Sequence, residues 1–127
     1  MMKKSYKAWA GAVVGIAVIV LIFFYFSGGK DEPGKYDAFA QCITDSEAAM
    51  YGAYWCPHCQ DQKDMFGDSW KLINYVECDP RGNNANPTLC QTQGVTGYPT
   101  WIFGDGQRES GTLSLNSIAS RTGCQLP

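Results

Sequence analysis

The hydrophobic pattern of the chain consists of one long uncharged run followed by short apolar segments interrupted by polar residues. Residues 8–26 contain no charged side chain, and at ~1.5 Å per helical residue the run would extend ~28 Å, close to the hydrocarbon thickness of a bilayer. Its bulky end at residues 23–26 is a poor cleavage site, although the small residues Ser27 and Gly29 leave a cleaved signal peptide as the alternative. We expect an uncleaved N-terminal single transmembrane helix at residues 8–26, in contact with the lipid bilayer.

The charges that flank this run predict its orientation. Three lysines and no acidic residue precede it, whereas Lys30 and Lys35 after it are offset by Asp31 and Glu32. The more basic flank of a membrane span stays in the cytoplasm. We therefore expect a cytoplasmic basic N-terminus at residues 1–7 and a domain on the other side of the cell membrane, in the periplasm or at the cell exterior.

Beyond the run, residues 27–35 are rich in glycine and charged residues, which is typical of a flexible linker. The apolar spacing then predicts helix, strand, helix, strand, helix, two strands of a hairpin and a helix, at 36–45, 48–55, 56–70, 73–78, 87–93, 100–103, 107–111 and after a cap at Ser114. Alternating β and α units pair two strands in parallel, and the hairpin adds an antiparallel edge. The prediction is an α/β domain at residues 36–127 with a central mixed four-stranded sheet flanked by helices.

The predicted domain is acidic. From residue 36 onward, ten acidic residues stand against five basic ones, which gives a net charge of about −5. A surface that binds phosphate groups needs clustered positive charge. We therefore expect no nucleic-acid partner for this domain.

Two cysteines three residues apart, Cys56 and Cys59, stand at the predicted start of a helix. Unpaired backbone N–H groups and the helix dipole stabilise a thiolate on the first of them. A close dithiol with one activated sulfur performs thiol–disulfide exchange, so we expect Cys56 as the nucleophile and Cys59 as the resolving thiol. A structural disulfide or half of a metal site is the alternative, but a zinc ribbon needs a second close pair, and Cys78 and Cys90 are twelve residues apart. We expect no metal and no cofactor besides a redox-active disulfide.

The two residues between these cysteines fit the same chemistry. Pro57 suits the first turn of a helix, where a missing N–H costs little. His58 is the only histidine of the chain, and its ring can favour a thiolate on Cys56. We therefore include both residues in the candidate catalytic site.

All six cysteines lie beyond the linker, and an even number in an oxidising compartment implies disulfides. The sequence alone does not choose among the possible pairings. A bond between Cys78 and Cys90 would close a loop of ~13 residues and stabilise the fold by ~3 kcal/mol in the chain-entropy model. A bond between Cys42 and Cys124 would close ~83 residues, for ~4.5 kcal/mol. We expect both to be structural, with electron relay between Cys78–Cys90 and the Cys-Pro-His-Cys pair as the alternative.

Three features together resemble the thioredoxin fold over roughly residues 36–124: the Trp-Cys-Pro-His-Cys motif at 55–59, the Gly-Tyr-Pro-Thr motif at 97–100, and the final hairpin and helix. More narrowly, residues 50–59, 75–78 and 97–101 resemble the thioredoxin-like domain associated with bacterial vitamin K epoxide reductase homologues. The Cys-Pro-His-Cys centre also resembles that of DsbA-type oxidants.

The resemblance implies specific roles for the second motif. Pro99 would be a cis proline facing the active disulfide, and the backbone of Tyr98 would be offered to an extended substrate peptide. Gly97 lies in the same loop, and Trp55 and Tyr98 would wall the substrate groove. A turn proline without this role is the alternative for Pro99.

One position departs from the thioredoxin pattern. That pattern often places a buried acid six residues before the leading cysteine, where it accepts the proton of the resolving cysteine, and here the residue is Met50. The departure disfavours thioredoxin-like reduction and favours oxidation or relay.

Together these inferences predict a membrane-anchored extracytoplasmic thiol–disulfide oxidoreductase. It would oxidise cysteine pairs of exported proteins through a mixed disulfide on Cys56, which Cys59 resolves. The resemblance implies reoxidation by a separate membrane quinone reductase of the vitamin K epoxide reductase or DsbB type. The alternatives are a disulfide reductase or isomerase fed by a membrane electron carrier, and a redox-inert binding module that uses the Tyr98–Pro99 groove.

Overall fold

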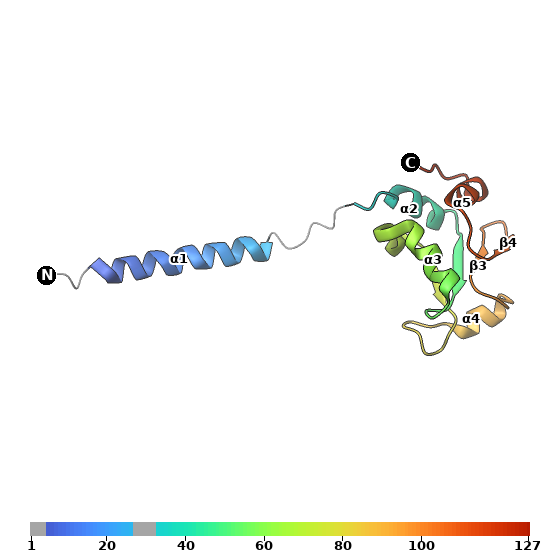
Figure 1. Cartoon of the computed structure of the whole chain (residues 1–127), viewed down its shortest axis with the longest axis horizontal. Coiled ribbons are helices and arrows are strands. Elements are labelled where there is room, and N and C mark those ends of the chain that lie inside the picture. Colours follow the sequence, from blue (N-terminus) through green and yellow to red (C-terminus); the bar gives the residue numbers. More distant parts are fainter. Residues whose placement is uncertain (1–4, 27–32) are drawn as a thin grey trace. The chain divides into compact units, whose positions relative to one another are not determined.

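The computed structural model describes residues 5–26 and 33–127, which belong to two separate units (Figure 1). The first unit contains one helix, α1 (Ser5–Phe26), of 22 residues. Among the described residues, no helix is both long and apolar enough to cross a membrane. The transmembrane span at 8–26 stays a prediction, and most of the predicted linker, 27–32, lies outside the described residues.

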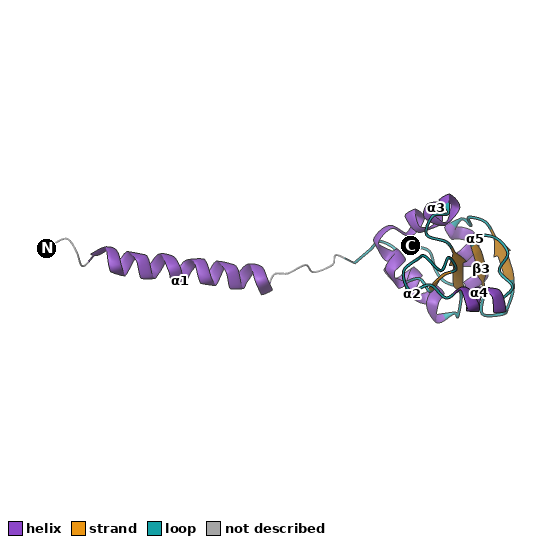
Figure 2. Ribbon diagram, turned by 90° about the horizontal axis from the view of Figure 1, so that it is seen from below, coloured by secondary structure: helices purple, strands orange, loops and turns teal. Residues whose placement is uncertain are grey.

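The second unit, residues 33–127, contains the predicted α/β elements. In chain order they are α2 (Asp37–Asp45), β1 (Ala49–Gly52), α3 (Pro57–Phe66), the 3₁₀ helix η1 (Gly67–Leu72), β2 (Tyr75–Glu77), α4 (Pro87–Thr92), β3 (Thr100–Ile102), β4 (Arg108–Ser110) and α5 (Leu115–Thr122). The four strands form one sheet in the order β2-β1-β3-β4, in which β1 and β2 are parallel and the other pairs antiparallel. The predicted mixed four-stranded sheet flanked by helices is confirmed, and this arrangement fits the predicted α/β thioredoxin-like fold. Figure 2 shows the helices packed around the strands.

Two predicted boundaries differ from the structure. The strand expected at 48–55 ends at Gly52, because the amide of Cys56 donates a hydrogen bond of 3.1 Å to the carbonyl of Ala53 and closes a turn. The helix expected at 56–70 ends at Phe66, because Gly67 has a φ of +54° that a right-handed helix does not allow. The chain continues from there as η1.

The sheet separates two apolar clusters, since successive side chains of a strand point to opposite faces. Met50 lies in the larger cluster with Cys56, Cys59 and Trp101. The smaller cluster, on the other face, contains Tyr51 with Cys78 and Cys90. The two active-site candidates and the Cys78–Cys90 pair therefore belong to different sides of the sheet.

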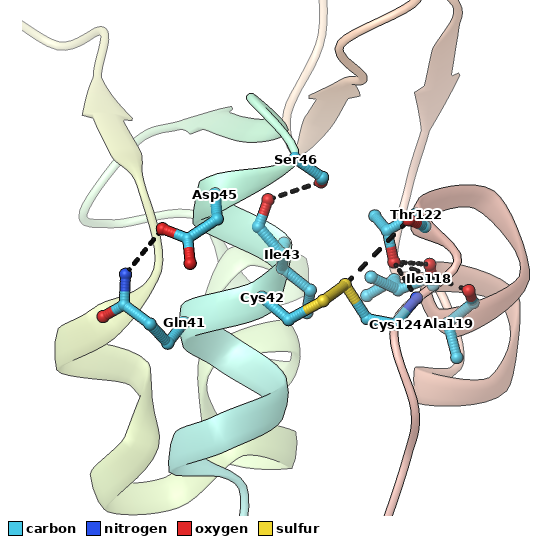
Figure 3. Close-up of a disulfide and its surroundings, with 9 residues drawn as sticks. All are labelled: Gln41, Cys42, Ile43, Asp45, Ser46, Ile118, Ala119, Thr122 and Cys124. Carbon is cyan, nitrogen blue, oxygen red and sulfur yellow. Dashed lines mark hydrogen bonds between the residues drawn. A yellow bond between two sulfur atoms is a disulfide. The ribbon is translucent and has the colours of Figure 1, made fainter.

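Two disulfides connect distant parts of the unit. Figure 3 shows Cys42, on α2, bonded to Cys124, which follows α5. The second bond joins Cys78, after β2, to Cys90 in α4. The sequence separations are 82 and 12 residues, so the first bond ties both ends of the unit together and the second closes one loop.

Candidate active site

The turn after β1 brings Cys56 to the position directly before α3. Cys56 is the N-cap residue of the helix, and Pro57 occupies the first turn, where its missing N–H leaves no helical hydrogen bond unmade. The thiol does not cap the helix and instead donates a hydrogen bond of 3.7 Å to the carbonyl of Tyr98. The sulfur thus lies between the start of α3 and the loop before β3.

Cys59 lies one turn further along α3 and is completely buried. Burial, with a smaller contribution from the neighbouring Cys56, raises the pKa of its thiol to about 12, although the backbone of Ala53 and the cation of Lys63 oppose the shift. Cys59 therefore keeps its proton at neutral pH. The structure holds both cysteines as free thiols, while the other four form disulfides.

The loop opposite Cys56 contains a cis peptide bond between Tyr98 and Pro99. The Thr100 hydroxyl donates to the carbonyl of Gly97 at 2.7 Å and closes this loop on itself. The Tyr98 ring meets the Trp55 ring edge to face, with centroids 6.2 Å apart. The structure thus brings the Trp55 and Tyr98 rings together and places the Tyr98 carbonyl against the Cys56 sulfur, while the substrate groove itself stays a prediction.

Trp55 is 53% exposed, which is unusual for the largest apolar side chain. Its indole N–H donates a hydrogen bond to the carboxylate of Asp79 at 2.7 Å, and the guanidinium of Arg81 donates to the same carboxylate oxygen at 2.7 Å. This bond fixes one edge of the ring, while about half of the side chain stays exposed. An aromatic face held in this way is suited to contact with an apolar part of a partner chain.

The His58 ring is exposed and lies next to Asp61. Its Nδ1 lies 3.8 Å from the carboxylate of Asp61, and both side chains are mostly exposed. Among the described residues, no hydrogen bond joins the His58 ring to either sulfur, so its predicted influence on Cys56 stays a prediction.

Three residues near Cys59 were missed by the sequence analysis: Lys63, Tyr75 and Glu77. Glu77 is only 5% exposed and receives hydrogen bonds from the Tyr75 hydroxyl at 2.8 Å and from the Asp79 amide at 2.9 Å. The ammonium of Lys63 lies 4.1 Å from the centroid of the Tyr75 ring. The available signal was an acidic residue within an otherwise apolar strand, which demands a buried partner.

No protein-family model matches the chain. The chain is similar to the thiol-disulfide oxidoreductase LTO1 of Arabidopsis thaliana, with 41% identity over 93 residues. The match covers 70% of this chain and 24% of that protein, so the chain spans about a quarter of the length of this relative.

The remaining cysteines lie apart from the site. Cys78 and Cys90 pack in the cluster on the opposite face of the sheet from Cys56 and Cys59. Within the part of the chain that the structure describes, no group of three or more His, Cys, Asp or Glu side chains is arranged to hold a metal ion. The reactive groups that the structure shows at the site include the two free thiols of Cys56 and Cys59.

Proposed function

We propose that this chain is a protein thiol–disulfide oxidoreductase whose reacting atoms are the sulfurs of Cys56 and Cys59. The observation that carries the proposal is the position of the Cys56 thiol, at the start of α3 and against the carbonyl of Tyr98. Only these two of the six cysteines are free. The 41% identity to a protein named as a thiol-disulfide oxidoreductase supports the same activity.

In the oxidising direction, the thiolate of a substrate protein attacks the Cys56 sulfur of the Cys56–Cys59 disulfide. The Cys56–Cys59 bond breaks, a mixed disulfide forms on Cys56, and Cys59 leaves as a thiolate that takes up a proton. The second substrate thiolate then attacks the substrate sulfur that is bonded to Cys56, which releases the Cys56 thiolate. The substrate loses two electrons, and the Cys56–Cys59 disulfide gains them and becomes a dithiol.

Reoxidation uses the same atoms in reverse. The Cys56 thiolate attacks a disulfide of the oxidising partner, and the Cys59 thiol loses its proton and attacks Cys56 to release that partner. During reoxidation, Cys59 therefore acts as the resolving residue, and it must lose its proton although it is buried. The partner that we propose is a membrane quinone reductase of the vitamin K epoxide reductase or DsbB type.

The oxidising direction is supported by Met50. The side chain is completely buried on β1, at the position where the thioredoxin pattern often has a buried acid. A methionine thioether cannot accept a proton in the way that a carboxylate can. We accordingly favour cysteine pairs of exported proteins as substrates over the reductase and isomerase alternatives.

The substrate would bind across the loop before β3. An extended peptide can pair with backbone groups next to Pro99, as a strand added to an edge, while the exposed Trp55 face and Tyr98 contact its side chains. This places a substrate cysteine beside the Cys56 sulfur.

Membrane anchoring is part of the same proposal. Residues 8–26 carry no charge, α1 is helical over 22 residues, and its large apolar side chains between Val13 and Phe24 are exposed. The basic flank at residues 1–7 supports a cytoplasmic N-terminus with the domain outside the cytoplasm. Protease treatment of intact spheroplasts tests this orientation, because only an outward domain would be digested.

The reduction potential of the Cys56–Cys59 pair tests the function. A potential near DsbA's value of about −120 mV would support the oxidase, whereas one near thioredoxin's value of about −270 mV would overturn the oxidising direction. A potential below about −300 mV together with an unreactive Cys56 would favour a redox-inert binding module. The full-length chain equilibrated with glutathione buffers gives this value directly.

A further inference from the structure

The buried carboxylate of Glu77 has no part in the mechanism described so far. A carboxylate that is 5% exposed loses most of its hydration, which destabilises the fold unless hydrogen bonds or an opposite charge compensate. The Tyr75 hydroxyl and the Asp79 amide donate to its two oxygens. Gly82 makes room for it, since a Cβ on Gly82 would lie 2.4 Å from the Glu77 Cγ. The fold is thus built around this side chain.

The strand register relates Glu77 to the cysteine pair through Gly52 and Tyr75. In the parallel pairing of β1 with β2, Gly52 lies opposite Glu77. A Cβ on Gly52 would lie 2.7 Å from the Cys59 sulfur and 3.4 Å from the Tyr75 hydroxyl oxygen. The sulfur and the hydroxyl therefore approach the same point, which only a glycine leaves open.

We propose that Tyr75 and Glu77 form a proton relay to Cys59, which removes the proton from its thiol when Cys59 must become a nucleophile during reoxidation of the dithiol by the oxidising partner. The inference rests on the proposed function. Among the described residues no direct hydrogen bond joins the thiol to the phenol, so the relay requires one bridging water molecule between them.

The relay balances in protons. The Cys59 S–H bond breaks and its proton passes through the water to the Tyr75 oxygen, while the Tyr75 proton moves to the Glu77 oxygen 2.8 Å away. The products are a Cys59 thiolate and a neutral Glu77 carboxylic acid. The thiolate then attacks the Cys56 sulfur of a mixed disulfide. In the oxidising half-reaction the same path runs backwards and protonates the leaving Cys59.

The surroundings of the relay favour this transfer. Burial, followed by the hydrogen bond to Glu77, raises the pKa of Tyr75, so the phenol keeps its proton and can act as a relay. The Lys63 ammonium over the Tyr75 ring stabilises negative charge on Cys59. The titratable and charged groups near the relay come from three parts of the fold. The start of α3 and the helix itself supply Cys56 and Lys63; β2 and the loop after it supply Tyr75, Glu77, Asp79 and Arg81; and the loop before β3 supplies Tyr98.

The test follows the two chemical steps separately in the full-length chain, held in detergent and reduced. Oxidised glutathione first forms a mixed disulfide with Cys56, in a step whose rate depends on glutathione concentration. Cys59 then displaces glutathione in an intramolecular step that does not. Quenching at low pH and mass spectrometry give both rates. The variants are Glu77→Gln and Tyr75→Phe, and Glu109→Gln at the opposite edge of the sheet is the matched control.

Near neutral pH, we expect both relay variants to close the disulfide at least about tenfold more slowly than wild type, because general-base catalysis is lost. The deficit should shrink as the pH rises toward about 9, where hydroxide can deprotonate Cys59 directly. Formation of the mixed disulfide should be unchanged, and Glu109→Gln should behave as wild type. Tyr75→Phe removes one oxygen only, so it keeps the test valid if Glu77→Gln folds poorly.

Two results in the variants would overturn the relay alone, and a third, in the wild-type chain, would overturn it together with the function. If the variants close at the wild-type rate, or if they lose the same factor at every pH, Glu77 and Tyr75 act only structurally or not at all. If the wild-type chain forms no mixed disulfide with glutathione, the proposed function fails and the relay with it. The first step therefore separates failure of the function from failure of the relay.

Discussion

The Cys56 thiol donates a hydrogen bond of 3.7 Å to the carbonyl of Tyr98, a residue 42 positions further along the chain. This contact joins the start of α3 to the loop that carries the cis bond before Pro99. Under the proposed function, a peptide that paired with the Tyr98 backbone would lie next to this sulfur. The contact therefore relates the reactive atom to the place where a substrate strand would lie.

The asymmetry between the two thiols predicts opposite effects of their substitution. Cys59→Ser should trap a mixed disulfide between Cys56 and a substrate cysteine, because the resolving thiol is missing. Cys56→Ser should form none, since Cys59 is completely buried and its pKa is raised to about 12 by that burial. Incubation with a glutathione buffer and intact-mass measurement would show the adduct on one variant only. An adduct of equal yield on Cys56→Ser would contradict the assignment of the nucleophile.

Gly52→Ala should destabilise the fold and disturb the dithiol. The added methyl group would lie 2.7 Å from the Cys59 sulfur, so the sulfur, the strand or the Tyr75 ring must move. Overpacking of this kind costs about 1–3 kcal/mol. Urea unfolding with both disulfides intact measures the loss.

Gly97→Ala is the matched control for that measurement. A Cβ at Gly97 would have no heavy atom within 4 Å, and this glycine has no positive φ. Its free energy of unfolding should stay within about 0.5 kcal/mol of wild type. Equal losses for the two variants would show that crowding at Cys59 is not the cause.

The sequence predicted features that depend on neighbouring residues better than those that depend on how distant strands pair. The pair at 56–59 and its position at a helix start depend on neighbouring residues, and the structure has them at the start of α3. The strand expected at 48–55 was too long, because apolar Tyr54 and Trp55 belong to an exposed turn and not to the sheet. Hydrophobic pattern alone cannot separate an exposed aromatic residue from a buried one.

Glu77 illustrates the other kind of omission. Its proximity to the site follows from the register between β1 and β2, where it lies opposite Gly52. A register is a relation between distant segments, so neither segment alone contains it. The same reasoning explains why the disulfide pairing stayed open at the sequence level, since it depends on how α2 and the segment after α5 meet.

Removing each disulfide should reveal its contribution. Replacing Cys42 and Cys124 together by serine should lower the free energy of unfolding by about 4.5 kcal/mol in the chain-entropy model, and replacing Cys78 and Cys90 by about 3 kcal/mol. Denaturant unfolding compares the two double variants. Both should retain the rate of mixed-disulfide formation at Cys56, because neither bond touches its sulfur.

The Cys78–Cys90 variant also tests electron relay. The two sulfurs pack on the other face of the sheet from the active pair. If reoxidation of Cys56–Cys59 by an added partner slows strongly in this variant while the fold remains intact, a structural role alone is contradicted. An unchanged rate is the expected outcome.

The contact between Trp55 and Asp79 predicts a dependence on acid pH. Hydrogen bonds from Arg81, and then the one from the Trp55 indole, hold the pKa of the Asp79 carboxyl well below its usual range. A depressed pKa in the folded state means that this group contributes stability above its unfolded pKa of about 3.9, and that the contribution is lost as the pH falls through the folded pKa. Arg81→Gln should therefore move the Asp79 titration up toward its usual value, and Trp55→Phe should move it less.

Carbon-detected NMR titration of the Asp79 carboxyl measures both shifts. Lys71→Gln, at an exposed lysine in η1, is the control that should leave the titration unchanged. An Asp79 carboxyl that titrates near 3.9 in the wild-type chain would contradict the contact, because an aspartate without these donors has that value.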